Sequence, residues 1–410
     1  MPATEGAPAS DTASSSTPSA TTPLAAHLAF APPFVVAGST VPILLVLPDT
    51  APTAAIDVEV GQPGASPTAA VFDPVSRRWI AEVDVPERST SLSLTVTVTV
   101  TEPAFGRTSG ELMVPIAPSG AAIAPSLPEV QPQRLVALPW GDGDGEVGYR
   151  TEAETDPVAP TALAIDPRNG NLLVLDTVNR RIVVVSGSAA VRTIELPGTG
   201  FVSDLVVAGD RGVAVVDGFG VGRPAVTAFL IDLDSGTVTE TGPGTIPANA
   251  PVNAPLVWNP TDATVYAVIG NQYYPIVNVD SAELQLDRAP ISWLNTTVNA
   301  SGTIDLGVGT GSIGVEFDET PGGLLDVIVG DNGDIWLLNS TIGVADSSGN
   351  TVHFWLVHLD PAAHTAALVK VALGYPFDGT RRLTVAGDTA FVMSNSAEAL
   401  VIDAYLLPAS

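Results

Sequence analysis

The sequence predicts an all-β protein. Short apolar runs recur along most of its 410 residues, and turns rich in glycine, proline, aspartate and asparagine separate them. Residues 92–100 alternate apolar residues with serine or threonine, which is the period of a strand with one buried face. No segment shows a convincing helical period. The chain is therefore expected to consist of strands and turns, and its length allows more than one domain.

Composition argues against several partners and chemistries. Its 16 basic residues stand against 44 acidic ones, which gives a formal net charge of -28 at pH 7. Nucleic acid and anionic membrane surfaces need a basic patch, so neither is an expected partner. The absence of cysteine removes disulfides, thiolate metal sites and cysteine nucleophiles. No apolar run is long enough to predict a membrane span.

The first segment, residues 1–25, is small, polar and interrupted by proline. It offers nothing large enough to bury, so we expect a disordered linker. Such tethers often follow an export signal or lipid anchor. We therefore expect a mature exported protein, extracellular or on the cell surface, whose signal precedes Met1; a native reading frame that begins at Met1 would contradict this.

The next segment, residues 26–117, predicts a β-sandwich. Apolar runs recur at a regular spacing, at residues 34–37, 41–47, 55–60, 69–72, 78–83, 92–100 and 110–115. About seven strands in about ninety residues is the size of an immunoglobulin-like domain. The cysteine framework of antibody domains is absent, so Trp79 is expected to be a core aromatic. Residues 118–132 are rich in proline and are expected to hold two domains apart as a semi-rigid connector.

Residues 160–185 carry the most informative pattern. An apolar strand led by proline is followed by a turn with Asp166-Pro and Asn-Gly, by a second apolar strand that ends at Asp176, and by Asn179-Arg-Arg-Ile, which opens a third strand. This order of parts resembles one unit of the NHL repeat. The resemblance implies a β-propeller, a fold that hosts enzymes, binding platforms and structural modules alike.

Residues 133–408 are long enough for six such units of roughly 40–50 residues. Further units are recognisable at 202–240, 252–288 and 324–372, whereas residues 289–320 predict either an irregular fourth blade or a long insertion. The ring is therefore expected to have six blades, or five if this segment is an insertion. The last unit, from 382 to 407, lacks one strand, and residues 133–138 are expected to supply it and to close the ring.

The polar residues of this unit have a structural interpretation. Asp176 and Asn179 occupy a tight turn, where their side chains can bond the backbone, and Arg180 or Arg181 can reach a carboxylate in a neighbouring turn. The resemblance assigns these residues to the scaffold, because the motif fixes the blade and catalyses nothing itself.

The loop that contains Asp142, Asp144 and Glu146 is the candidate metal site. Alternating carboxylates separated by glycine can converge on a hard cation, and Ca²⁺ takes six to eight oxygen ligands. The loop does not match an EF-hand, so a solvated loop without metal remains the alternative. No other cofactor is expected.

Histidines are scarce, and the two in the strand-like run 352–358 do not predict a metal site. His353 and His358 are an odd number of positions apart, so they lie on opposite faces of a strand. NHL-like amidating lyases use metal-ligating histidines, which this chain lacks in sufficient number. Gluconolactonase-like propellers need calcium ligands from several blades, whereas Asp326, Asp331 and Asp334 fall in one predicted hairpin.

Two further features are open to a structural and a functional interpretation. The glycines of residues 307–311 lie in a loop of an all-β chain, so their spacing does not indicate a cofactor site. Tyr273, Tyr274 and Trp293 are either an aromatic contact patch or part of the packing.

We favour a non-enzymatic binding or scaffold protein, which presents a propeller face or channel to a protein or glycan ligand. The alternatives are a calcium-dependent propeller hydrolase or lyase of the lactonase kind, and a structural component of a virion or filament. A calcium ion held on the channel axis by several blades would favour the enzyme. A channel filled with apolar side chains would favour the binder.

Overall fold

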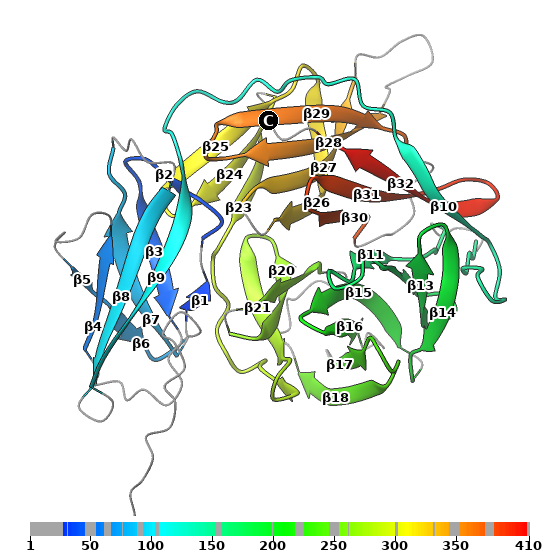
Figure 1. Ribbon diagram of the computed structural model, residues 1–410, viewed down its shortest axis with the longest axis horizontal. Coiled ribbons are helices and arrows are strands. Elements are labelled where there is room, and N and C mark those ends of the chain that lie inside the picture. The colour runs from blue at the N-terminus through cyan, green and yellow to red at the C-terminus, as the bar shows by residue number, and fades with distance from the viewer. Residues whose placement is uncertain are drawn as a thin grey trace, which may run out of the picture.

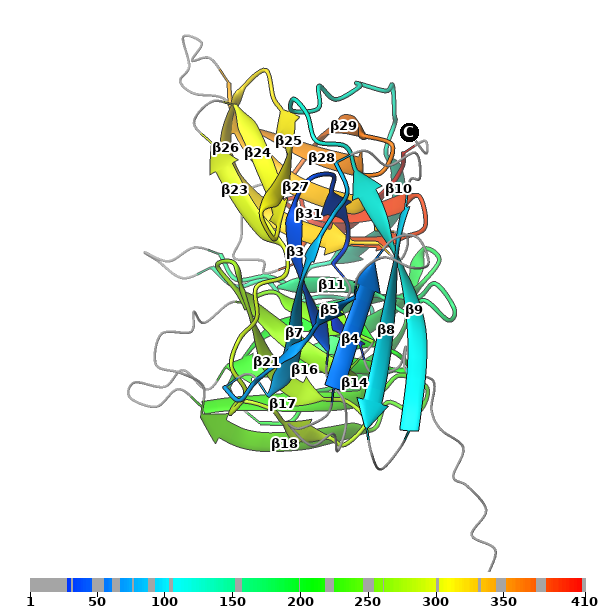
Figure 2. The same ribbon diagram turned by 90° about the vertical axis from the view of Figure 1, so that its left-hand side faces the viewer.

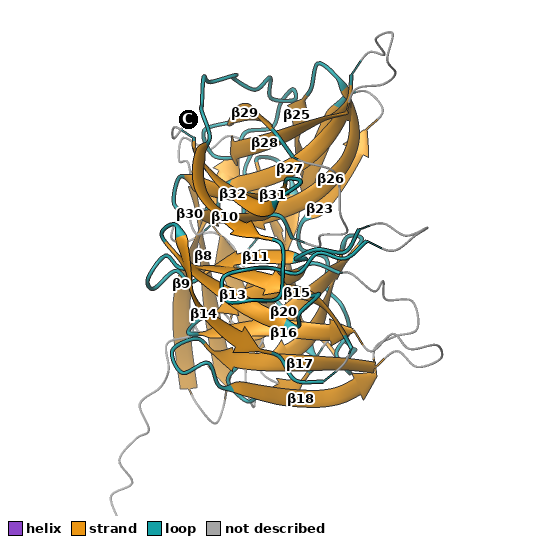
Figure 3. Ribbon diagram, turned by 90° about the vertical axis from the view of Figure 1, so that its right-hand side faces the viewer, coloured by secondary structure: helices purple, strands orange, loops and turns teal. Residues whose placement is uncertain are grey.

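The computed structural model (Figure 1) consists of strands and connecting loops. It describes residues 28–30, 32–45, 55–60, 67–75, 77–87, 93–102, 106–151, 157–198, 200–217, 225–245, 254–260, 262–299, 302–330, 333–343, 352–373 and 381–407. No helix occurs in these ranges (Figure 3). The expected all-β class is confirmed, and the predicted linker at residues 1–25 lies outside the described part.

The N-terminal domain consists of two sheets. One has the order β1 (Leu28–Phe30), β3 (Thr40–Leu45), β7 (Arg78–Asp84), β6 (Val71–Asp73). The other has the order β2 (Val35–Val36), β9 (Gly106–Ala117), β8 (Ser93–Glu102), β4 (Ala55–Val60), β5 (Thr68–Ala69). The alternating run forms β8, and its apolar residues from Leu94 to Val100 are buried. Trp79 is also buried, as expected of a core aromatic, and contacts Phe72.

Six antiparallel sheets follow in the described residues. The first three have four strands each in chain order: β11 (Ala162–Ile165), β12 (Leu172–Asp176), β13 (Arg181–Ser186), β14 (Ala189–Glu195); β15 (Phe201–Ala208), β16 (Arg211–Asp217), β17 (Ala225–Asp232), β18 (Val238–Thr245); β19 (Leu256–Asn259), β20 (Thr264–Ile269), β21 (Gln272–Asn278), β22 (Glu283–Leu284). The repeat-like unit at 160–185 thus forms three adjacent strands, in the expected order.

The remaining sheets include an irregular one. Residues 289–320 contribute three strands, β23 (Asn295–Asn299), β24 (Thr303–Val308) and β25 (Gly311–Glu316). The next sheet has four: β26 (Thr320–Val329), β27 (Ile335–Ile342), β28 (Val352–Asp360), β29 (Thr365–Val371). The last has the order β10 (Gln133–Pro139), β32 (Ala399–Leu406), β31 (Thr389–Asn395), β30 (Leu383–Ala386).

The last sheet joins the two ends of the propeller region. β10 pairs with β32 along its length, from Gln133 opposite Ala404 to Pro139 opposite Ala399. Val136 and Leu138 of β10 are buried beside Leu400 and Ile402. The predicted closure by residues 133–138 is confirmed. It removes an exposed edge that would otherwise pair with other chains.

The strands β11, β15, β19, β23, β26 and β30, here called the inner strands, bring the sheets together. β11 contacts β15 and β30, β15 contacts β19, and β26 contacts β23 and β30. Successive antiparallel sheets whose inner strands meet, with the last sheet closed by an early strand, are the arrangement of a β-propeller.

The proline-rich connector lies along the outer edges of two sheets (Figure 1). Ile123 forms a parallel bridge with Val315 of β25, and Ser126 forms one with Ala367 of β29. The amide of Ile123 donates to the carbonyl of Gly314 at 2.7 Å, and the amide of Leu368 donates to the carbonyl of Ser126 at 2.8 Å. The connector is therefore fixed to the propeller at both points.

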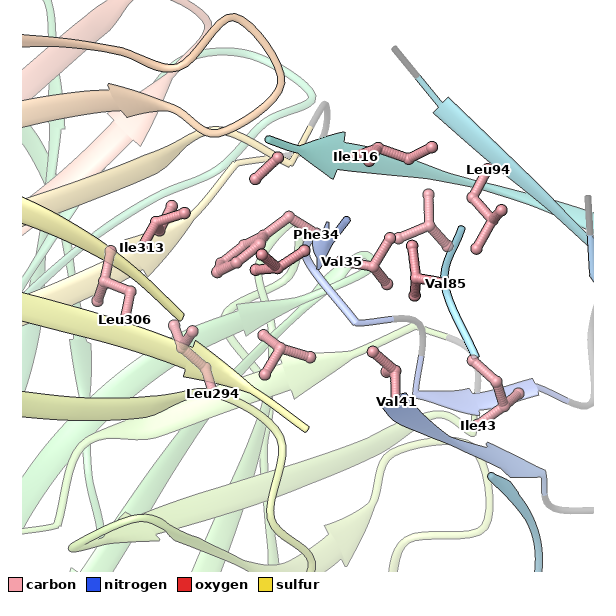
Figure 4. Close-up of a cluster of buried hydrophobic side chains, with 14 of the residues drawn as sticks. Phe34, Val35, Val41, Ile43, Val85, Leu94, Ile116, Leu294, Leu306 and Ile313 are labelled. Atoms are coloured by element: carbon pink, nitrogen blue, oxygen red, sulfur yellow. The ribbon is translucent and has the colours of Figure 1, made fainter. Parts of the chain in front are cut away.

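The two domains share one apolar core, so the expectation that the connector holds them apart was wrong. Phe34 of the N-terminal domain is fully buried in a cluster that includes Leu294, Leu306 and Ile313 of the propeller (Figure 4). Figure 2 shows the sandwich lying against the side of the propeller. Proline limits the bending of a connector but does not oppose the burial of complementary apolar faces, which decides the arrangement here.

A polar contact crosses the same interface. The Arg78 side chain is fully buried, and its Nη2 donates to the Tyr266 hydroxyl at 3.1 Å. That hydroxyl donates to Oδ2 of Asp262 at 2.5 Å. A buried guanidinium needs such partners, because its desolvation is otherwise costly.

The glycine-rich loop at 307–311 makes a close contact between the domains. Gly309 has φ 58°, and a Cβ there would lie 2.2 Å from the Thr40 carbonyl oxygen. The adjacent Thr310 amide donates to that oxygen at 3.0 Å, and the Thr40 amide donates to Oγ1 of Thr310 at 2.8 Å. The glycine serves a left-handed turn against another backbone.

Candidate functional site

A cavity of about 1170 Å³ lies where the N-terminal domain meets the inner strands. All six inner strands contribute residues to its lining, including Leu163, Leu205, Leu256, Thr296, Leu324 and Thr384. The N-terminal domain adds Pro32, Pro33, Ser93, Leu112, Met113 and Pro115. Most of these side chains are apolar, so the cavity favours an apolar occupant.

The contact between the N-terminal domain and the loop that precedes β27 forms one part of the cavity wall. Gly333 has φ 84°, and a Cβ there would lie 2.6 Å from the Pro33 carbonyl oxygen and 2.8 Å from Cγ of Pro115. Both prolines line the cavity. A residue with a side chain at position 333 would therefore displace this wall, because both neighbours are rigid.

Tyr273 and Trp293 also belong to the cavity wall and pack edge to face, with ring centroids 5.4 Å apart. Tyr273 is buried, and its hydroxyl donates to the Leu294 carbonyl at 3.3 Å. Both rings line the cavity. Two of the three aromatic residues named from the sequence, Tyr273 and Trp293, are thus part of the packing around the cavity, whereas Tyr274 is not among its lining residues.

Two buried aspartates share one local structure on the inner strands. Asp204 of β15 and Asp326 of β26 each follow an irregularity in the strand register. In each, Oδ1 accepts a bond from the next residue's amide, at 2.7 Å for Leu205 and 3.1 Å for Val327. The bulge turns the carboxylate out of its own sheet and frees the second oxygen for a neighbouring sheet.

The second oxygen joins each sheet to another one. Oδ2 of Asp204 accepts a hydrogen bond from the Leu256 amide at 2.6 Å. Oδ2 of Asp326 accepts bonds from the amides of Arg382 and Leu383, both at 3.0 Å. Each aspartate therefore satisfies the backbone of an adjacent inner strand, where a buried amide without a partner would be destabilising.

Arg381 occupies the space between these carboxylates. Its Nη2 lies 3.3 Å from Oδ2 of Asp204 and also donates to the Leu256 carbonyl. Its backbone amide donates to the Thr161 carbonyl at 3.0 Å, and its carbonyl accepts from the Leu163 amide at 3.1 Å. Arg381 is 7% exposed and belongs to the cavity lining, as does Asp326.

Burial controls the ionisation of this cluster. Desolvation raises the pKa of Asp326 to about 6, against the opposing effect of the Arg381 charge and the two backbone bonds. Desolvation also raises the pKa of Asp204, and the Arg381 charge again opposes the shift. The positive charge of Arg381 therefore offsets only part of the pKa increase that burial causes in these two carboxyls.

The loop predicted as a calcium site is held by an arginine. Arg181 donates to the carbonyls of Asp142, Gly143 and Glu146 at 3.0, 3.1 and 2.9 Å. Oε2 of Glu146 accepts from the Gly143 amide at 2.9 Å, and Asp142 and Asp144 are exposed. The carbonyl oxygens of the loop already accept hydrogen bonds from the Arg181 guanidinium. The remaining ligands for Ca²⁺ are therefore mainly solvated carboxylates. In the described part of the chain, no three acidic or histidine side chains form a metal-binding group.

The polar residues of the repeat-like unit join their own hairpin to the loop at residues 141–148. Asp176 is fully buried and accepts bonds from the Gly148 amide at 3.0 Å, Asn179 Nδ2 at 2.9 Å and Arg181 Nε at 3.0 Å. Arg180 has φ 54° and donates to the Pro197 carbonyl. The scaffold geometry is as expected for Asp176 and Asn179. Arg181 reaches a carboxylate, that of Asp176 across its own turn, whereas the bond described for Arg180 runs to a carbonyl.

The two histidines of β28 lie on opposite faces, as predicted. His353 Nδ1 lies 2.7 Å from Oε1 of Glu319. His358 is buried, stacks on Trp336 with centroids 3.9 Å apart, and places Nε2 2.9 Å from Oδ2 of Asp334. Each histidine thus belongs to a separate polar cluster.

The Arg381 cluster was not predicted from the sequence. Asp326 was expected in one hairpin with Asp331 and Asp334, but Asp326 lies near Arg381 whereas Asp334 contacts His358, and Asp331 lies outside the described residues. A signal was present, because Asp204 and Asp326 each interrupt an otherwise apolar strand. An ionisable residue in such a strand must find buried partners.

No family model matches the sequence, and no curated protein matches it. Similar solved structures include hydrazine synthase from Kuenenia stuttgartiensis, with 12% identity over 73% of this chain and 70% of that one and a TM-score of 0.26. A catalytically inactive virginiamycin B lyase from Staphylococcus aureus shares 14% identity over 68% of this chain and 100% of that one, with a TM-score of 0.35. The WD40 domain of SCAP from fission yeast shares 9% identity over 87% of this chain and 97% of that one, with a TM-score of 0.25. At these values the likenesses carry no argument about function, and the propeller assignment rests on the sheet order.

None of the described residues forms a helix that could span a membrane.

Proposed function

We propose that this chain is a non-enzymatic binding protein whose cavity accepts an apolar ligand. The observation that carries the proposal is the cavity of about 1170 Å³, lined mainly by apolar side chains from all six inner strands and from the N-terminal domain. Ligand sites are typically concave and mostly apolar, with a few polar groups that fix orientation. A glycan would need more hydrogen-bond partners than this lining offers, so an apolar ligand, or an apolar group of a protein partner, fits it better.

The proposal includes a finer description of the fold. We propose six blades, with the three-stranded sheet β23–β25 as the fourth, because β23 contributes to the cavity lining with the other inner strands. We also propose an NHL-like first blade and an immunoglobulin-like N-terminal domain. An alignment of related sequences, made strand by strand, tests the assignment. Related chains in which β23–β25 are missing while the other sheets remain would contradict a fourth blade.

We further propose an extracellular or cell-surface location. Its support is the small, polar, proline-containing segment at residues 1–25, which suits a tether. Fractionation of the source cells, with the protein detected in the medium or removed from intact cells by protease, tests the location. Detection in the cytoplasmic fraction alone would contradict it.

A fluorescence titration tests the binding proposal. N-phenyl-1-naphthylamine is neutral and apolar, and its emission rises when it leaves water. We expect saturable binding with energy transfer from Trp258 and Trp293, which line the cavity. Substituting Val257→Trp adds bulk to the lining and should weaken binding about tenfold or more.

The matched control is Val191→Trp, which adds the same side chain at a position that is 59% exposed and outside the cavity lining. This variant should bind as the native chain does. An absence of saturable binding, or equal affinity in the Val257→Trp and native proteins, would contradict the proposal.

A further inference from the structure

Arg381 supplies a cationic donor to an otherwise mainly apolar cavity. It is the basic residue of the lining and is more than nine-tenths buried. Its Nε and Nη2 donate to Asp204 and to the Leu256 carbonyl, whereas the bonds described for its side chain do not involve Nη1. A charged donor in a mainly apolar cavity forms a strong hydrogen bond, so a ligand that accepts a bond from Nη1 gains affinity.

The charges around Arg381 restrict the acceptor. Asp204 pairs with the guanidinium at 3.3 Å, and the nearby Asp326 carboxylate also interacts with its charge. With both acids ionised the cluster carries a net charge of about −1. An anionic ligand would add a further negative charge in a poorly solvated place, where repulsion is weakly screened. A neutral acceptor meets no such repulsion.

We infer that the cavity selects an apolar molecule that carries a neutral carbonyl group, and that Nη1 of Arg381 donates to this carbonyl. The inference rests on the proposed function, and it adds a ligand class and an orienting residue. The apolar body would lie against Val207, Val257 and Leu324, which are partly exposed residues of the lining on three inner strands. In mostly apolar pockets, a small number of polar groups usually fixes the orientation of the ligand.

Three naphthalenes of similar size test the selection in the native protein. We would measure the dissociation constants of 2-acetylnaphthalene, 2-ethylnaphthalene and 2-naphthoate by competition with N-phenyl-1-naphthylamine. Hydrophobic transfer alone favours the ethyl compound, because it is the most apolar of the three. The inference instead predicts that the ketone binds about tenfold or more tightly than the ethyl compound, with the carboxylate weakest at pH 7.5.

The variant Arg381→Lys tests the donor. Lysine keeps a positive charge for Asp204 but lacks the second terminal nitrogen of the guanidinium. We expect the ketone to lose more affinity than the ethyl compound, so that the preference for the ketone disappears; the ratio of the two dissociation constants in the same variant is the readout. The matched control is Arg192→Lys, because Arg192 donates to the Leu233 and Asp234 carbonyls outside the cavity lining. It should keep the preference.

The outcomes separate this inference from the proposed function. If no naphthalene and no N-phenyl-1-naphthylamine binds, the proposed function fails. If all three bind in order of their hydrophobicity, or the carboxylate binds most tightly, the cavity binds ligands but the inference about Arg381 is overturned. If Arg381→Lys does not fold, the order of the three affinities in the native protein still decides the question.

Discussion

At the scale of single residues, Asp204 and Asp326 show how a buried charge can hold a propeller together. Both follow an irregularity in an inner strand, both bond the next amide with Oδ1, and both bond an adjacent sheet with Oδ2. The sequence reveals their ionisable character in an apolar strand but not their partners. Arg381 lies 177 positions from Asp204, and only the folded ring brings the two together.

Asp326 should give the protein a defined pH dependence. Its folded-state pKa of about 6 lies above the ordinary value of 3.8. Between these values the folded state binds more protons than the unfolded one, so the stability contributed by this group is greatest below pH 3.8 and is lost as pH rises through 6. Asp326→Asn removes this titration and also places an amide against the Arg382 and Leu383 donors.

We therefore expect Asp326→Asn to be less stable than the native protein, with a larger loss at pH 4 than at pH 7. The loss should differ by up to about 3 kcal/mol between these two conditions. Urea unfolding of both proteins at each pH measures this. An equal loss at both values, or a larger one at pH 7, would show that the carboxyl does not titrate as described.

Gly309 and Gly187 allow a matched test of the domain contact. Both adopt a left-handed conformation, with φ 58° and 59°, but a Cβ at position 187 would meet nothing within 4 Å. Alanine at either site should lose about 1–2 kcal/mol of stability from the backbone conformation. Gly309→Ala should lose about 1–3 kcal/mol more, because its Cβ collides with the Thr40 carbonyl. Thermal unfolding compares them, and equal losses would argue against a close contact there.

The Asp142–Glu146 loop yields a prediction about calcium. Since Arg181 already donates to three of the loop's carbonyls, we expect calorimetric titration of metal-free protein with calcium to show no saturable heat. A stoichiometric binding isotherm that Asp144→Asn weakens would restore the calcium interpretation.

At the scale of elements, the strand patterns predicted most of the fold because each strand alternates or is apolar over its own length. The unit at 160–185 was the clearest, since its three strands are buried almost throughout. Residues 289–320 were ambiguous because β23 and its neighbours are short and rich in threonine, asparagine and glycine. Their burial depends on the N-terminal domain, which a local pattern cannot show.

The closing strand gives the prediction at this scale. Leu138 of β10 is 2% exposed in the closed sheet, whereas Leu127 in the preceding connector is 65% exposed. Leu138→Ala should lose about 2–5 kcal/mol of stability, and Leu127→Ala should lie within about 0.5 kcal/mol of the native protein. Denaturant unfolding measures both. A small loss in Leu138→Ala would mean that β10 does not complete the last sheet in solution.

At the scale of the whole molecule, the N-terminal domain is a wall of the candidate site as well as a neighbour of the propeller. It shares an apolar cluster with the propeller, inserts Arg78 beside Tyr266, and lines the cavity with Pro33 and Pro115. No local pattern predicts this arrangement, because the residues involved are spread over both domains. The site therefore requires both domains in contact.

The location of a bound ligand is the most direct test of whether the cavity binds an apolar molecule beside Arg381. We propose crystals of the full chain with 6-bromo-2-acetylnaphthalene, whose bromine can be located by anomalous scattering. We expect one bromine peak inside the cavity among Val207, Val257 and Leu324, with the carbonyl oxygen within hydrogen-bond distance of Nη1 of Arg381. An empty cavity, with the ligand absent or bound on an outer face of the propeller, would contradict it.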